Sequence, residues 1–236
     1  MLSELLLFDI ETVPQAPSFD ELDAESQFLF RQKLAKTMPE ELSDEEKYGK
    51  KAGILAEFGK IICISLAIFE VGADGSRALR MQTLSGHDEV EILRSFTVFC
   101  DSIHRRIPNF QFAGHNVREF DIPYICRRLL INRLSLPVYL QLHDKKPWEV
   151  RMFDTLSWWK FGDYKNYVSL HLLASVLGIP SSKSDIDGSQ VREVYYVQND
   201  LPRIAAYCRR DVVVTANIIL RFLGHPMLDD CNILVV

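Results

Sequence analysis

The sequence carries no excess of positive charge. Its 27 lysines and arginines are outnumbered by 32 aspartates and glutamates, which gives a formal net charge of −5 at pH 7. A protein that coats duplex nucleic acid by neutralising phosphates is expected to be basic over much of its surface. We therefore expect any contact with a polyanion to use a local patch or a bound metal.

Cysteine pairs and long apolar runs are also missing. The five cysteines are odd in number, scattered and never spaced Cys-x-x-Cys, which argues against a disulfide framework or a zinc ribbon. No run reaches the ~18 uncharged apolar residues of a membrane span, and the N-terminus shows no basic leader before an apolar segment. These absences predict a soluble cytoplasmic protein with no membrane partner.

The length of 236 residues suits one domain with an insertion, at about 150 residues per domain. We predict a single domain over 1–236. Residues 15–53 are acidic and polar, so we predict a helical insertion there, after the first strand. That segment is too small to be expected to form a core of its own.

Apolar patterning predicts the order of the remaining elements. Expected strands cover 5–11, 60–71, 77–84, 110–114 and 150–153, and expected helices cover 88–105, 122–134, 170–177, 189–197 and 201–223. Three strands precede the first long helix of this series, and helices and strands alternate afterwards. The order favours an α/β fold of the ribonuclease H-like type: a mixed five-stranded sheet, antiparallel in its first three strands and flanked by helices.

Asp9 and Glu11 lie two residues apart in the first expected strand, so their side chains point to the same side of the sheet. Two carboxylates this close repel each other unless a cation neutralises them. Hard oxygen ligands suit Mg²⁺ or Mn²⁺. The alternative is that both are solvated residues at a strand end.

Asp211 falls at the edge of the inward stripe of the last expected helix, with Tyr207 one turn earlier on the same side. A carboxylate aimed at the core needs a partner. That partner is either an arginine in a buried ion pair or a metal shared with Asp9 and Glu11.

Asp121 precedes an expected helix and follows Asn116 by a short turn. It is either a helix N-cap or a further metal ligand, because aspartate is favoured in both roles. Asn116 itself suits a turn. Asp154 is predicted to be an N-cap rather than a catalytic residue.

Taken together, these acidic segments resemble the three motifs of the DEDD superfamily of 3′–5′ exonucleases. Residues 8–12 (FDIET) resemble the first, residues 115–121 (HNVREFD) the second and residues 207–211 (YCRRD) the third. The tyrosine in the third motif is typical of the DEDDy branch. The resemblance covers roughly 5–224, and residues 15–53 are its main departure.

More closely, the chain is similar to predicted exonucleases related to the proofreading domain of family B DNA polymerases. Residues 58–65 (FGKIICIS) and 177–180 (LGIP), followed by Lys183, fit that group. The resemblance implies a 3′–5′ exonuclease that acts on 3′ ends, favouring single-stranded DNA, and releases 5′-mononucleotides. Nucleic acid is the implied partner, together with other replication or repair proteins.

The same resemblance implies a two-metal site with Mg²⁺ or Mn²⁺. Asp9, Glu11 and Asp211 would hold one cation, and Asp9 would bridge to a second cation backed by Asp121. Tyr207 would orient the attacking water. These five residues are the predicted catalytic set, and the four carboxylates among them are the predicted metal ligands.

Four further residues are predicted to bind substrate: Thr12, Asn116, Phe120 and Lys183. Thr12 would meet the terminal sugar, Phe120 would wedge against a base and Lys183 would contact a phosphate. Aromatic residues and lysines also alternate over 158–167. That segment suits stacking on unpaired bases, or its rings form part of the core.

Two other functions stay open at this stage. One is a catalytically inactive nucleic-acid-binding or scaffold module with the same fold. The other is an aspartyl-phosphate phosphatase of the haloacid-dehalogenase type, with Asp9 as nucleophile and Asp229–Asp230 as its late acidic pair. The phosphatase needs a parallel, Rossmann-like strand order, which the expected opening meander does not give.

Overall fold

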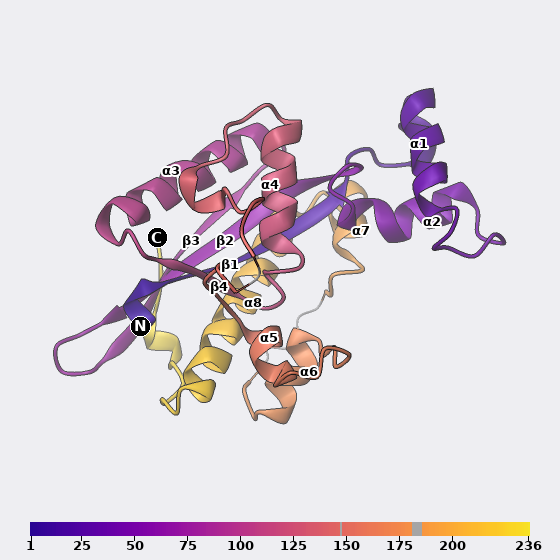
Figure 1. Ribbon diagram of the computed structural model, residues 1–236. Helices are drawn as coiled ribbons and strands as arrows, with labels where there is room; N and C mark the ends of the chain where they lie inside the picture. The colour runs from indigo at the N-terminus through magenta and orange to yellow at the C-terminus, as the bar shows by residue number, and fades with distance from the viewer. Residues whose placement is uncertain (147, 181–185) are drawn as a thin grey trace.

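The structure, a computed structural model, describes residues 1–146, 148–180 and 186–236. These residues form one six-stranded sheet in the order β5-β4-β1-β2-β3-β6, with helices on both faces (Figure 1). The strands are β1 (Leu5–Pro14), β2 (Gly59–Val71), β3 (Arg77–Ser85), β4 (Gln111–Gly114), β5 (Met152–Asp154) and β6 (Ile233–Val235). The helices are α1 (Ala24–Leu34), α2 (Asp44–Lys51), α3 (Glu89–Arg106), α4 (Asp121–Ile131), α5 (Thr155–Lys160), α6 (Leu170–Val176), α7 (Val191–Tyr196) and α8 (Leu201–Phe222).

The predicted α/β fold is confirmed, and its strand count is wrong by one. β1, β2 and β3 pair antiparallel, as expected. The additional strand, β6, pairs parallel to the edge of β3, with Leu79 opposite Ile233. Three residues are too few for an alternating pattern to be visible in the sequence. The pairing depends on the edge that β3 offers in the folded chain.

The alternation of side chains along β1 decides what each face of the sheet contains. Leu6, Phe8 and Ile10 pack into a core cluster with α3 and α4. Leu5 and Leu7 point the other way and pack against α8. Asp9 and Glu11 continue the second series, so the period of the strand directs both carboxylates to the face that α8 covers.

Residues 15–53 extend from the end of β1 and carry α1 and α2 (Figure 1). The expectation that this insertion lacks a core is wrong, because Phe19, Phe30 and Tyr48 form a small buried aromatic cluster with neighbouring residues. Arg192 of α7 fastens the insertion to the main body. Its Nη2 donates to the Pro17 carbonyl at 2.6 Å and pairs with Glu45 at 2.5 Å.

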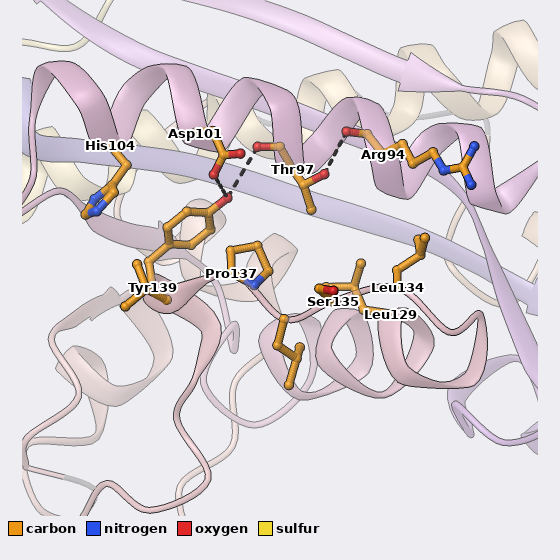
Figure 2. Close-up of a pocket in the computed structure, with 11 residues that line it drawn as sticks. Arg94, Thr97, Asp101, His104, Leu129, Leu134, Ser135, Pro137 and Tyr139 are labelled. Carbon is orange, nitrogen blue, oxygen red and sulfur yellow. Dashed lines mark hydrogen bonds between the residues drawn. The ribbon is translucent and has the colours of Figure 1, made fainter.

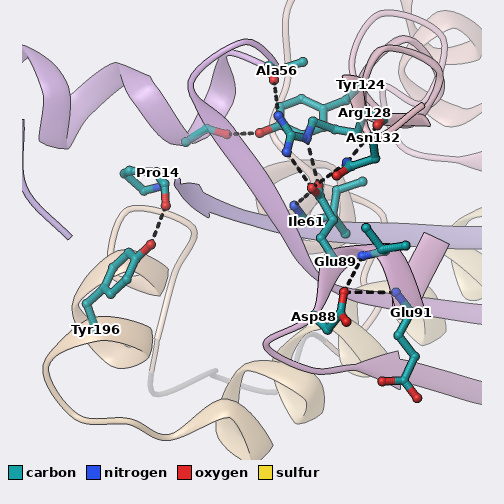
Figure 3. Close-up of polar contacts among 12 residues, drawn as sticks. Pro14, Ala56, Ile61, Asp88, Glu89, Glu91, Tyr124, Arg128, Asn132 and Tyr196 are labelled. Atoms are coloured by element: carbon teal, nitrogen blue, oxygen red, sulfur yellow. Dashed lines mark hydrogen bonds and ion pairs between the residues drawn. The ribbon is translucent and has the colours of Figure 1, made fainter. Parts of the chain in front are cut away.

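A buried ion pair joins α3 and α4, the two helices that cover one face of the sheet (Figure 3). Arg128 of α4 pairs with Glu89 of α3 at 2.5 Å, and both side chains are 7% exposed. The Glu89 carboxylate also accepts from the Ile61 backbone at 2.7 Å, and Arg128 donates to the Ala56 carbonyl at 2.8 Å. Each nitrogen of the guanidinium and each oxygen of the carboxylate therefore has a partner, and α4 is fixed against both α3 and β2.

A pocket of about 390 Å³ lies between α3 and the segment that follows α4 (Figure 2). At its edge, the Tyr139 hydroxyl lies 2.9 Å from the Asp101 carboxylate and 3.3 Å from the Thr97 carbonyl. None of the predicted site residues lines this pocket. The pocket lies on the face of the sheet that α3 and α4 cover, opposite the face that α8 covers.

Candidate active site

Asp9 and Glu11 of β1 project to one side, as the strand period predicts. Their carboxylate oxygens and the Cys208 sulfur of α8 all lie within 4.8 Å of one another. The register of β1 with β2 shifts between Glu11 and Thr12, so the strand is irregular immediately after the second carboxylate. Asp9 Oδ2 is buried and accepts no hydrogen bond from any described residue. An unpaired buried carboxylate oxygen is costly, which makes it a strong candidate for a cation ligand.

Asp121 approaches the same strand from α4. It is the first residue of that helix, and Phe120 takes the capping position, so the N-cap alternative for Asp121 is wrong. Instead, Asp121 Oδ1 accepts a hydrogen bond from the Ile10 backbone at 3.2 Å. The loop between β4 and α4 follows Gly114 and passes close to β1. Glycine is needed at this position, because a Cβ would lie 2.9 Å from the Phe8 carbonyl oxygen.

Asp211 and Tyr207 lie one turn apart on α8, close enough for Tyr207 to lower the pKa of Asp211. Asp200 caps this helix, as its side chain accepts from the Arg203 backbone at 3.1 Å. Burial raises the pKa of Tyr207, and the nearby charges of Asp211, Glu11 and Asp9 raise it further. The phenol is therefore protonated at neutral pH and acts as a hydrogen-bond donor, not as a base.

Burial raises the pKa of all four predicted metal ligands, and repulsion from the other carboxylates adds to it at Asp9 and Glu11. Burial raises the pKa of Asp9 well above its usual range, and the charges of Glu11, Asp121 and Asp211 add to that effect. Burial, followed by the charge of Asp211, also raises the pKa of Glu11 well above its usual range. Burial raises the pKa of Asp121 to about 7 and that of Asp211 to about 6. Asp9 and Glu11 thus feel the charges of Asp121 and Asp211, although the group of ligand atoms within 4.8 Å of one another contains Asp9, Glu11 and Cys208 and not Asp121 or Asp211.

A divalent cation fits this set of side chains. Four carboxylates supply the hard oxygen ligands that Mg²⁺ and Mn²⁺ prefer, and a cation would relieve the repulsion between them. Cys208 is not a suitable ligand. Its thiol bonds to the Asp9 backbone carbonyl at 3.4 Å, and burial raises its pKa, so it stays protonated beside the carboxylates.

The predicted substrate-binding residues lie around this cluster, apart from Lys183, which lies outside the described residues. Thr12 lies near enough to Tyr124 to affect the pKa of its hydroxyl, and the Phe120 ring packs at 5.4 Å from the Tyr124 ring while staying partly exposed. Asn116 has a left-handed backbone, with φ of 62°, and its buried Oδ1 has no hydrogen-bond partner among the described residues. The loop thus holds a polar side chain ready for a ligand.

Asp154 has a larger part in the site than its sequence position indicates. Its predicted N-cap role is confirmed by hydrogen bonds from the Leu156 and Ser157 backbones. The same carboxylate also accepts from the backbones of Asn116 at 3.1 Å and Arg118 at 3.0 Å. It therefore holds the loop that precedes Asp121 in shape, a role that depends on contacts across 36–38 residues of sequence.

His171, at the start of α6, is a further residue that the sequence patterns did not single out. It lies near enough to Asp211 to lower the pKa of that carboxyl, against the larger opposing effect of burial. Its position in an ordinary amphipathic helix gave no signal for a place beside the carboxylates.

The aromatic segment divides into two groups. Trp158 stacks between Phe153 at 4.7 Å and Phe222 at 5.9 Å, so this ring belongs to the protein interior on one side. Phe161 and Tyr164 are 87% and 85% exposed. The core alternative therefore holds for part of the segment only.

The sheet order and the flanking helices define an α/β protein with a ribonuclease H-like fold. Residues 54–227 match the family described as a predicted 3′–5′ exonuclease related to the exonuclease domain of PolB, and the chain belongs to that family. It is similar in fold to the family B DNA polymerase from the hyperthermophilic archaeon Pyrobaculum calidifontis, with a TM-score of 0.52 and 16% sequence identity. That match covers 93% of this chain and 24% of the polymerase chain. No curated protein matches the chain.

The strand order does not fit the phosphatase alternative. That alternative requires parallel strands, whereas β1, β2 and β3 pair antiparallel. Its late acidic pair, Asp229 and Asp230, is exposed beside β6. Among the described residues, no helix is long and apolar enough to cross a membrane.

Proposed function

We propose that this chain is a divalent-metal-dependent 3′–5′ exonuclease that removes 5′-mononucleotides from the 3′ end of single-stranded nucleic acid, with DNA as the preferred substrate. The observation that carries the proposal is the pair Asp9 and Glu11, whose ligand oxygens lie within 4.8 Å of each other and whose pKa values are raised by burial and by the charges of Asp121 and Asp211. Family membership supports the same activity.

The four carboxylates would hold two cations, Mg²⁺ or Mn²⁺. Bound there, such ions supply charge that stabilises the attacking and leaving oxygens of a phosphodiester. Asp9, whose Oδ2 lacks a partner among the described residues, suits a bridging position. Asp121 holds its place through the Ile10 backbone.

Tyr207 would orient the attacking water. Its hydroxyl is protonated, so it would donate its single proton in a hydrogen bond to the water oxygen while an adjacent carboxylate accepts a proton from the water. Phe120 and Thr12 flank the cluster where the last base and sugar would lie, and Asn116 offers its side-chain oxygen on the same loop. Lys183 is retained as a phosphate contact on sequence grounds.

The activity is tested with single-stranded DNA and RNA of about 20 nucleotides, labelled at the 5′ end in one set and at the 3′ end in another. We expect 5′-labelled strands to shorten stepwise in Mn²⁺ or Mg²⁺ and to stay intact in EDTA, with the 3′ label released as a mononucleotide. Asp9→Asn should be inactive, whereas Asp20→Asn, at an exposed position of the insertion, should match the wild type. Intact strands in every metal condition would favour the inactive scaffold module.

The expected setting is a reducing compartment such as the cytoplasm. All five cysteines are free thiols, and three of them are buried. DNA repair and an association with replication or repair proteins follow only from the likeness to a proofreading domain, and pull-down from cell extract is the measurement that addresses them.

A further inference from the structure

Three aromatic rings stand exposed within seven residues between α5 and α6. Phe161 is 87% exposed, Tyr164 is 85% exposed and Tyr167 is 61% exposed. Rings of this size usually contribute to a core or an interface, because they carry a large apolar area. The two tryptophans immediately before them make more contacts: Trp158, though 44% exposed, stacks on Phe153, and Trp159 packs partly buried against a core cluster.

The backbone at Phe161 holds its ring outward at a cost. Phe161 ends α5 in the left-handed conformation, with φ of 44° and ψ of 34°, and Gly162 follows with φ of 89°. A bulky residue in this region is an outlier, and glycine is the residue that a left-handed helix end normally carries. Retaining phenylalanine there indicates a use for the exposed ring.

The segment is fastened beside the carboxylate cluster at both ends. Lys160 Nζ lies 3.3 Å from the Glu119 carboxylate, two residues before Asp121, and 4.0 Å from the centre of the Tyr167 ring. His115 of the same loop bonds to the Thr155 hydroxyl at 2.9 Å and to the Val168 carbonyl at 3.0 Å. The exposed rings are thus carried on a segment whose two ends contact the loop that positions Asp121.

The segment from Phe161 to Tyr167 carries one lysine and one aspartate, so the exposed rings are its main feature for binding. Lys165 is exposed between Tyr164 and Tyr167. The one acid in this stretch, Asp163, uses Oδ1 to accept from the Lys165 backbone at 3.2 Å. In a chain with a net charge of −5, affinity for nucleic acid has to come from such local features. Aromatic faces bind any unpaired base, whatever its sequence.

We propose that Phe161, Tyr164 and Tyr167, together with Lys165, form a stacking platform for the unpaired nucleotides that lie upstream of the 3′ end in the carboxylate site. The platform rests on the proposed exonuclease function for its location and deepens it, because it makes a single strand, not a duplex end, the substrate. Paired bases are already stacked on each other and offer no free face to the rings.

The test compares wild type, Phe161→Ala/Tyr164→Ala and the control Phe28→Ala, which removes a ring that is 56% exposed on α1. For each, kcat/KM is measured for 3′-end hydrolysis of a 12-nucleotide strand and of a dinucleotide, as DNA and as RNA. Each lost stack should cost roughly tenfold, so the 12-mer-to-dinucleotide ratio should fall about 100-fold in the double variant and stay unchanged in the control. An unchanged ratio in the double variant overturns the platform.

Binding of the same labelled 12-mer, measured by fluorescence anisotropy in Ca²⁺, separates this proposal from the exonuclease function. If wild type binds the strand and the double variant binds it about 100-fold more weakly, the platform stands even if no hydrolysis occurs. Equal binding by both proteins rejects it, and points to a protein partner for the rings. Phe161→Gly distinguishes function from structure: we expect a higher Tm from relief of the left-handed strain together with weaker strand binding, and a lower Tm would assign the ring a structural role.

Discussion

Replacing Asp121 by asparagine tests the charge crowding at the site through stability alone. Asparagine keeps a side-chain oxygen that can accept the hydrogen bond from the Ile10 backbone, but it removes the charge. Burial raises the pKa of Asp121 from an ordinary 3.8 to about 7 in the metal-free protein. A folded state that holds its proton more tightly than the unfolded chain loses stability as pH rises from about 4 to about 7.

The size of the effect follows from that difference. Each pKa unit corresponds to about 1.4 kcal/mol, so the roughly three units at Asp121 amount to about 4 kcal/mol above pH 7. About two of these units lie between pH 5 and pH 8, or about 3 kcal/mol. Since 1 kcal/mol moves Tm by about 2–4 °C in a chain of this size, wild type should lose roughly 6–12 °C more than Asp121→Asn over that interval.

Thermal unfolding in EDTA at pH 5 and pH 8 measures this difference directly. Asp20→Asn is the matched control, because its carboxylate is exposed, and it should follow the wild-type curve. Adding Mn²⁺ at pH 8 should raise the Tm of wild type more than that of Asp121→Asn. If wild type and Asp121→Asn show the same change in Tm between the two pH values, the raised pKa and the reasoning built on it are incorrect.

Three further predictions address the site and its support. Asp9→Asn should abolish hydrolysis of labelled single strands while raising Tm in EDTA, because one crowded charge is removed; retained hydrolysis would rule Asp9 out as a ligand. Tyr207→Phe should lower kcat by about 100-fold with Mn²⁺ affinity by calorimetry unchanged, and lost metal binding would contradict its role in orienting water. Arg128→Ala should lower the free energy of unfolding in urea by about 3–5 kcal/mol, because it leaves the buried Glu89 charge unpaired. The control Arg127→Ala, at the exposed neighbouring position, should change it by less than about 0.5 kcal/mol. Equal effects of the two substitutions would contradict the burial argument.

Elements with strong local signals were predicted well from sequence. α8 begins after Asp200 and is followed by Gly224 with φ of 69°, as its N-cap, proline and glycine indicate. The insertion over 15–53 was predicted to be helical, but α2 was not predicted as a separate helix, although Ser43 and Glu46 form a capping box at its start. The polar composition of 15–53 concealed a helix whose signal lies in its cap and not in an apolar period. β6 has no local signal strong enough to predict it, since its pairing depends on β3.

At the site, the period of β1 was enough to predict that Asp9 and Glu11 share a side. Spacing along the chain could not say which elements would complete the cluster, because α4 and α8 reach it through packing on opposite faces of the sheet. The resemblance to exonuclease motifs supplied that information. The contacts of Asp154 with the loop before Asp121, and the position of His171 near Asp211, came only from the folded chain. Both depend on contacts between segments distant in sequence.

The central claim is that four carboxylates from β1, α4 and α8 together hold two cations. Crystals grown with Mn²⁺ and measured for anomalous scattering test it most directly. We expect two anomalous peaks about 3.5–4 Å apart, ligated by Asp9, Glu11, Asp121 and Asp211, and the loss of at least one of the two peaks in crystals of Asp9→Asn, because Asp9 is the proposed bridging ligand. Manganese bound elsewhere, or no manganese at these carboxylates at millimolar concentration, would contradict the account.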